Sequence, residues 1–208
     1  MKEKLIISLI DDNVNENESL TEIRNYFSQI CKNHLDLLSS NFSSNNEIYE
    51  KISLYLKSLK DTFGFIVLYY YGHGSYYYNN EQALNPIDGN PIKLAKIINL
   101  FEKTNKDVKI VIFLHCDFTP CKEKEEEIEM NINNDKVQNY WIGFISELGV
   151  EISLDEKLTK SFICTLKERN FDSPDKFWNM HEVSTKQQCY EFSKAVKTNC
   201  NYEFMSLF

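Results

Sequence analysis

The chain has 208 residues, 42% of them hydrophobic, and a formal net charge of −8. This length and composition allow a substantial core, built as one domain or as two closely joined halves. The negative charge argues against nucleic acid and anionic membranes as partners. No apolar run is long enough to span a membrane, no secretory signal follows Met1, and six cysteines without paired spacing indicate reduced thiols in the cytoplasm.

The amino-terminal region alternates predicted strands and helices. Residues 5–10 are predicted to form the first strand, and Ser19 with Glu22 predicts a capping box at the start of an amphipathic helix. A short second strand is expected near residues 37–38 or just after them, and apolar residues at helical spacing predict a second helix over 48–59. Such alternation is typical of βαβ units, which gives an α/β protein with a mostly parallel sheet.

Two further apolar runs end in chemically reactive residues. Residues 65–71 and 108–114 each have the pattern of a strand buried on both faces, and the first is expected to end at Gly72. The next residues include His73 after the first run and Cys116 after the second. Open α/β sheets bind ligands at the carboxyl ends of their strands, so we expect His73 and Cys116 at one edge of one sheet. A thiol and an imidazole placed together can act as a nucleophile and its base.

The chain changes character after Cys116. Residues 122–129 form a charged run without an apolar face, which predicts a linker. Cys116 and Cys121 are the only close cysteine pair and lack a second pair of ligands, so we expect no metal site and no cofactor. Regular structure is predicted to resume as a strand over 140–150, a helix over 158–166, a helix from Ser173 and a last strand near Phe204.

The order and spacing of these motifs resemble those of the caspase-type cysteine peptidases. Residues 71–74 are similar to the family's His-Gly motif, 110–116 to its cysteine strand, and 141–146 to the strand that follows its interdomain linker. The resemblance implies a three-layer α-β-α, caspase-haemoglobinase-like fold with helices on both faces of the sheet. It also implies one domain made of a large-subunit-like half over 1–121, a linker over 122–138 and a small-subunit-like half over 139–208.

The resemblance implies hydrolysis of peptide bonds by a dyad of Cys116 and His73. The thiolate would attack the scissile carbonyl, the imidazole would pass a proton to the leaving amine, and the backbone N–H groups of Gly74 and Cys116 would form the oxyanion hole. Asp135 is the linker position best placed for cutting a zymogen, although a surface loop that is never processed is an equal alternative. The implied partners are a protein or peptide substrate and a second chain, in a homodimer or in a heterodimer with another caspase, joined through residues 202–207.

The expected substrate pocket departs from the family. Leu114 stands where the family carries a glutamine, Leu154 where it carries an arginine, and Asp117 where an arginine follows the cysteine. An aspartate preference is therefore not supported, because a buried substrate carboxylate needs such partners. Two hypotheses remain: an active endopeptidase of altered or unknown P1 preference, acting in apoptosis or its regulation, and a catalytically degenerate homologue that binds and modulates an active caspase.

Overall fold

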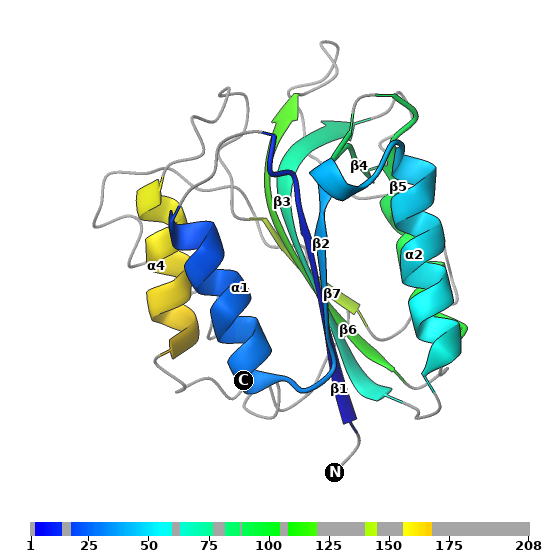
Figure 1. Ribbon diagram of the computed structural model, residues 1–208, viewed down its shortest axis with the longest axis horizontal. Helices are drawn as coiled ribbons and strands as arrows, with labels where there is room; N and C mark the ends of the chain where they lie inside the picture. The colour runs from blue at the N-terminus through cyan, green and yellow to red at the C-terminus, as the bar shows by residue number, and fades with distance from the viewer. Residues whose placement is uncertain are drawn as a thin grey trace.

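The protein folds around a mostly parallel β-sheet. The computed structural model describes residues 3–13, 18–59, 63–76, 82–87, 89–104, 108–119, 140–144 and 156–167. The parallel strands lie in the order β2-β1-β3-β6-β7 (Figure 1). Their bounds are β1 (Glu3–Ile10), β2 (His34–Leu38), β3 (Phe63–Tyr76), β6 (Lys109–Thr119) and β7 (Tyr140–Phe144).

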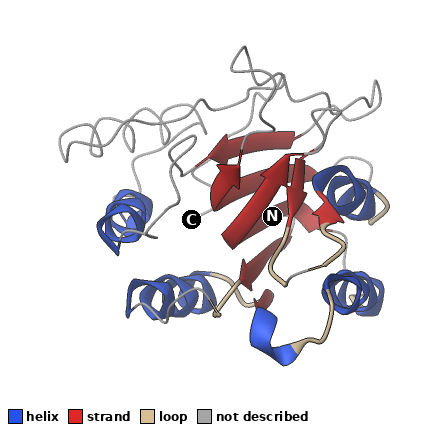
Figure 2. Cartoon of the chain, turned by 90° about the horizontal axis from the view of Figure 1, so that it is seen from above, coloured by secondary structure: helices blue, strands red, loops and turns tan. Residues whose placement is uncertain are grey.

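Two pairs of helices cover the two faces of the sheet. Helices α1 (Glu18–Ile30) and α4 (Glu156–Lys167) lie on one face, and α2 (Asn45–Ser58) and α3 (Leu94–Glu102) lie on the other (Figures 1 and 2). Each face has its own hydrophobic cluster. The predicted α/β class and its three layers, helix, sheet and helix, are therefore confirmed.

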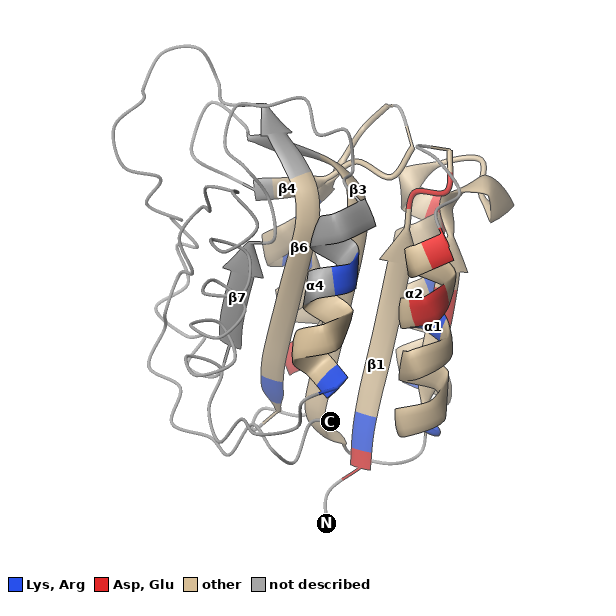
Figure 3. Ribbon diagram, turned by 90° about the vertical axis from the view of Figure 1, so that its left-hand side faces the viewer, with Lys and Arg blue, Asp and Glu red and all other residues tan. Residues whose placement is uncertain are grey.

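The strands supply both clusters because their side chains alternate between the faces. In β1, Leu5, Ile7 and Leu9 pack toward α2 and α3, whereas Ile6 and Ile10 pack toward α1 and α4. Charged side chains described in β1 and β6 lie only at the amino-terminal ends of these strands (Figure 3). A strand buried on both faces needs apolar side chains along most of its length, which leaves charged side chains at its ends.

Strand β3 does not end at Gly72, so the expected end of this strand is wrong. It continues to Tyr76 because the extension finds partners on both sides. Gly74 pairs with Phe118 of β6 and, in antiparallel register, with Leu84 of β4 (Gln82–Leu84). Strand β6 likewise passes Leu114, and β4 is paired in turn with β5 (Ile92–Lys93). Ladder pairing on both sides thus outweighs the local preference of the glycines for a turn.

Other boundaries differ by a few residues. Ser19 is the second residue of α1 and is buried, so it is not the N-cap that the capping box requires. Strand β2 begins at His34, earlier than expected, and is followed by a 3-10 helix over Ser39–Asn41. The helices expected over 48–59 and 158–166 are confirmed as α2, which Ser44 caps, and α4.

Several expectations lie outside the described residues. They concern the linker over 122–138, Asp135, Leu154, the helix from Ser173, the last strand near Phe204 and the dimer contact at 202–207. The strand expected over 140–150 is described only as β7. None of the described helices is long and apolar enough to cross a membrane.

Candidate functional site

The candidate site lies at the carboxyl ends of β1, β3 and β6. The parallel strand order reverses between β1 and β3, since β2 follows on one side and β6 and β7 follow on the other. Open α/β sheets bind ligands beside such a switch point. Asp11 follows β1, Gly72 and His73 lie in β3, and Cys116 lies in β6.

The two dyad candidates occupy neighbouring strands, one residue out of register. Gly72 is paired with Cys116, and His73 with residue 117. Because paired strands lie about 4.8 Å apart, the backbones of His73 and Cys116 are adjacent. Paired residues share a face of the sheet and successive residues alternate. The imidazole of His73 is therefore directed to the face opposite that of the Cys116 thiol.

The side chains of Cys116 and His73 also differ in their exposure to solvent. Cys116 is fully buried and packs with Leu114 in the cluster beneath α2 and α3, whereas His73 is exposed. Leu114, expected to line a substrate pocket, is also fully buried. Gly74, expected in the oxyanion hole, has a strand on either side, so its N–H lies in the plane of the sheet. In the described conformation the Cys116 thiol is thus closed off from solvent.

Asp11 is a site residue that sequence reasoning missed. Its N–H donates to the carbonyl of Tyr71 at 2.8 Å, which fixes the end of β1 beside β3. Its Oδ1 accepts from the Ser39 hydroxyl at 3.0 Å and from the N–H and Nδ2 of Asn13 at 3.2 and 3.3 Å. Burial raises the pKa of the Asp11 carboxyl, while these hydrogen bonds and the nearby charge of His73 act in the opposite direction. Two successive aspartates after an apolar strand were the available signal.

Gly72 leaves room for Asp11, at the end of β1, and for the hydroxyl of Tyr70 to lie close to the backbone of β3. A Cβ atom at this position would lie 2.6 Å from Cβ of Asp11 and 3.0 Å from Oη of Tyr70. Its φ of +149° is also one that residues with a side chain rarely adopt. Asp11, Gly72 and Cys116 consequently lie in one row across three strands and on one face, with the glycine leaving room between the other two.

Asp12 is tied to the 3-10 helix next to this row. Its Oδ1 accepts from the N–H of Ser40 at 2.8 Å and from the hydroxyl of Ser39 at 2.9 Å. Burial raises the pKa of Asp12, but the hydrogen bonds from Ser40 and Ser39 outweigh burial and hold it below the usual value. These contacts connect the loop after β1 to the residues after β2, so they fix the position of this loop beside the candidate site.

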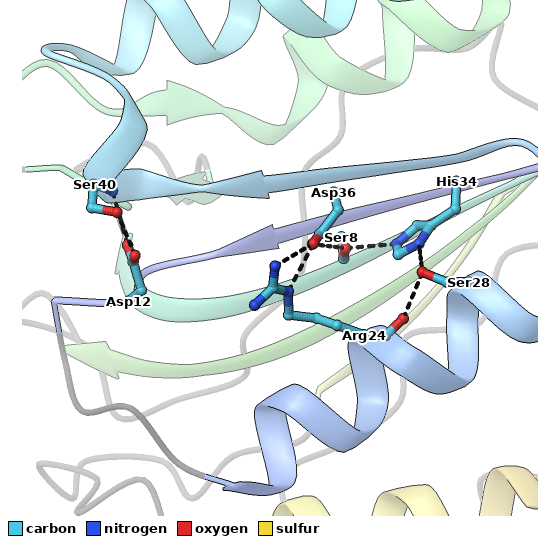
Figure 4. A network of polar contacts seen from close by, with 7 residues as sticks. All are labelled: Ser8, Asp12, Arg24, Ser28, His34, Asp36 and Ser40. Carbon is cyan, nitrogen blue, oxygen red and sulfur yellow. Dashed lines mark hydrogen bonds and ion pairs between the residues drawn. The ribbon is translucent and has the colours of Figure 1, made fainter.

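A second polar network lies away from this edge, between β1, β2 and α1 (Figure 4). The hydroxyl of Ser8 contacts Nε2 of His34 and Oδ1 of Asp36, each at 2.8 Å. Arg24 pairs with the other oxygen of Asp36 at 2.5 Å, and the hydroxyl of Ser28 contacts Nδ1 of His34 at 2.8 Å. Burial lowers the pKa of His34.

This network joins structural elements and is not a serine-hydrolase site. Ser8 is fully buried under α1, and Asp36 contacts the serine rather than the imidazole, so the order of a catalytic triad is absent. Within the described ranges, no group of three or more His, Cys, Asp or Glu side chains could hold a metal ion.

Comparison with known proteins gives information on the fold. No protein-family model and no curated protein sequence matches the chain. Among solved structures, the chain is similar to the crystal structure of protein GSU0716 from Geobacter sulfurreducens, with a TM-score of 0.54 and 11% sequence identity, over 87% of this chain and 88% of that chain. At this identity the likeness shows the α/β fold alone.

Proposed function

We propose that the chain is a caspase-like cysteine endopeptidase that uses Cys116 as nucleophile and His73 as general acid and base. One observation carries this proposal: β3 and β6 are neighbouring parallel strands that bring these two residues to the same edge of the sheet, next to its switch point. A thiol and an imidazole on adjacent strands at a ligand-binding edge are the parts that nucleophilic acyl transfer requires.

The proposed chemistry needs the closed conformation to open. Cys116 would lose its proton to His73, attack the peptide carbonyl and form an acyl-enzyme, while the imidazolium returns the proton to the leaving amine. The backbone N–H groups of Gly74 and Cys116 would hold the oxyanion, for which each donor is worth about 10²–10³ in rate. Both groups are part of β-ladders in the described conformation, so residues 72–76 have to leave their pairing for the site to work.

The remaining features of the proposal follow from the resemblance. The substrate is a protein or peptide in the cytoplasm, and its P1 preference is altered or unknown, because Leu114 and Leu154 stand where the family carries polar pocket residues. The linker is either cut at Asp135, as in a zymogen, or left unprocessed, and the chain acts in a homodimer or with another caspase, in apoptosis or its regulation.

Peptide probes with a thiol-reactive end test the proposal. A panel that differs only at the P1 position is incubated with the protein, and the modified cysteine is identified by mass. We expect one probe to label Cys116 selectively and faster than the exposed Cys164, and the labelling to be lost in His73→Ala. Slow labelling of Cys116 by every probe, no faster than that of Cys164, under conditions in which a small alkylating reagent does reach Cys116, would refute an activated dyad.

A specific observation favours a second candidate, a catalytically degenerate homologue that binds and modulates an active caspase. Cys116 is fully buried and on the face opposite His73, which is a stable core position for a cysteine without a catalytic role. Under this candidate the protein would change the activity of a purified caspase, and Cys116→Ala would leave that effect intact. Under the first candidate, Cys116→Ala abolishes the protein's own cleavage of peptides.

A further inference from the structure

Two donors converge on the carbonyl oxygen of His73. The hydroxyl of Tyr70, which lies in the cluster beneath α2 and α3, donates to it, and the N–H of Asn85 donates to it at 3.0 Å. Tyr70 precedes His73 by three residues on β3, whereas Asn85 follows β4. The His73 peptide is therefore held both from within the core and from the neighbouring turn.

Asn45, the first residue of α2, in turn holds the turn that contains Asn85. Its Nδ2 donates to Oδ1 of Asn85 at 3.1 Å and to the carbonyl of Ile87 at 2.6 Å. Its Oδ1 accepts from the N–H of Ile87 at 3.1 Å. Asn45 is buried and residues 85 and 87 are half-buried, so these three contacts join α2 to residues 85–87 at a site partly shielded from solvent.

The clamped peptide lies at the start of the extension of β3. Residues 74–76 pair with β4 on one side, and residues 72–75 pair with residues 116–119 of β6 on the other. As long as the extension stays paired, His73 remains one residue out of register with Cys116. The two side chains then lie on opposite faces, and the thiol stays in the core.

We propose that Asn45 and Tyr70 form a latch that holds the candidate site closed. Through the His73 carbonyl, the latch keeps residues 72–76 in β3. Its release frees this segment from the sheet and makes the Cys116 thiol accessible. The meaning of the latch for catalysis rests on the proposed dyad, but its effect on the accessibility of the thiol does not.

Alkylation with iodoacetamide, followed by mass spectrometry of each cysteine, tests the latch. Two variants weaken it: Tyr70→Phe removes one donor and keeps the ring, and Asn45→Ala removes three contacts. One hydrogen bond shifts an opening equilibrium by about two- to tenfold, so we expect alkylation of Cys116 to accelerate by that factor in Tyr70→Phe and by at least about tenfold in Asn45→Ala. Tyr70→Phe also covers the case in which Asn45→Ala folds poorly.

The chain offers matched controls. Tyr26→Phe removes another tyrosine hydroxyl that donates to a backbone carbonyl, that of Leu166 at 3.2 Å, and Asn46→Ala alters the exposed neighbour of Asn45. Neither control should change the rate at Cys116. The buried Cys31 and the exposed Cys164 serve as internal references.

Two results would overturn the latch. One is an unchanged alkylation rate at Cys116 in both weakened variants. The other is a rise at Cys31 by the same factor as at Cys116, because that would report general unfolding. Faster alkylation of Cys116 in the two weakened variants, without any labelling of these same variants by the peptide probes, would support the latch and refute the peptidase, so the two proposals fail separately.

Discussion

Replacing Gly72 by alanine should destabilise the fold through a specific collision. The added methyl group would lie 2.6 Å from Cβ of Asp11 and 3.0 Å from Oη of Tyr70. Cβ of Asp11 moves only with the backbone, and the Asp11 N–H is bonded to Tyr71 at 2.8 Å, so the end of β1 would have to shift. Overpacking of this kind costs about 1–3 kcal/mol. The positive φ adds about 1–3 kcal/mol for any residue with a side chain.

Gly89→Ala separates these two costs. Gly89 has a φ of +132°, but a Cβ there would have no atom within 4 Å, so alanine at this position carries only the backbone cost. Urea and thermal unfolding, followed by far-ultraviolet circular dichroism, should show Gly72→Ala to be less stable than Gly89→Ala by about 1–3 kcal/mol, or roughly 2–12 °C in Tm. Equal losses in the two variants would refute the close approach of β1 to Gly72.

Three further outcomes follow from the described contacts. Because burial lowers the pKa of His34, the unfolded chain binds the proton more readily than the folded chain. Stability is therefore lost as the pH falls below about 6.5. Urea unfolding at pH 7.5 and 5.5 should show that His34→Gln loses less stability between these two pH values than the unaltered protein does. Burial raises the pKa of Asp11, so its charge costs stability at neutral pH, and Asp11→Asn, which keeps an acceptor for Ser39, should raise the urea midpoint at pH 7. A fall in that midpoint would contradict this. Phe162→Ala removes a fully buried ring stacked 5.5 Å from that of Tyr69 and should cost about 3–5 kcal/mol by urea unfolding, whereas Phe162→Leu should cost less than about half of that.

The layers of the fold could be predicted because the spacing of apolar residues in each element indicates whether it is a strand or a helix and which of its faces are buried. Continuous apolar runs identified β1 and the first parts of β3 and β6, and apolar residues at helical spacing identified α1 and α2. Strand β2 was placed too late, although His34, Leu35, Asp36 and Leu37 alternate polar and apolar residues as an edge strand does. That period-two pattern was an available signal.

The site could be predicted only in part, because its geometry depends on pairing between distant segments. The sequence indicates that His73 and Cys116 follow two strands, but not that the strands continue or that these residues are one position out of register. Likewise, the partner of Asp11 is Ser39, 28 residues away, and contact between them follows from the pairing of β1 with β2. The conformational preferences of neighbouring residues do not indicate which distant loops the pairing of strands brings together.

The packing of α4 has a consequence for the continuity of the chain. Phe162, Ile163 and Leu166 complete the cluster that contains Phe27, Tyr69 and Phe113, and β7 pairs with β6. Both contacts join residues before position 120 to residues after position 139 without using the peptide bonds between them. A chain cleaved in that interval would therefore keep its sheet and its aromatic cluster as a non-covalent complex. Each fragment alone would expose an apolar face, so the two fragments should fold by complementation and not separately.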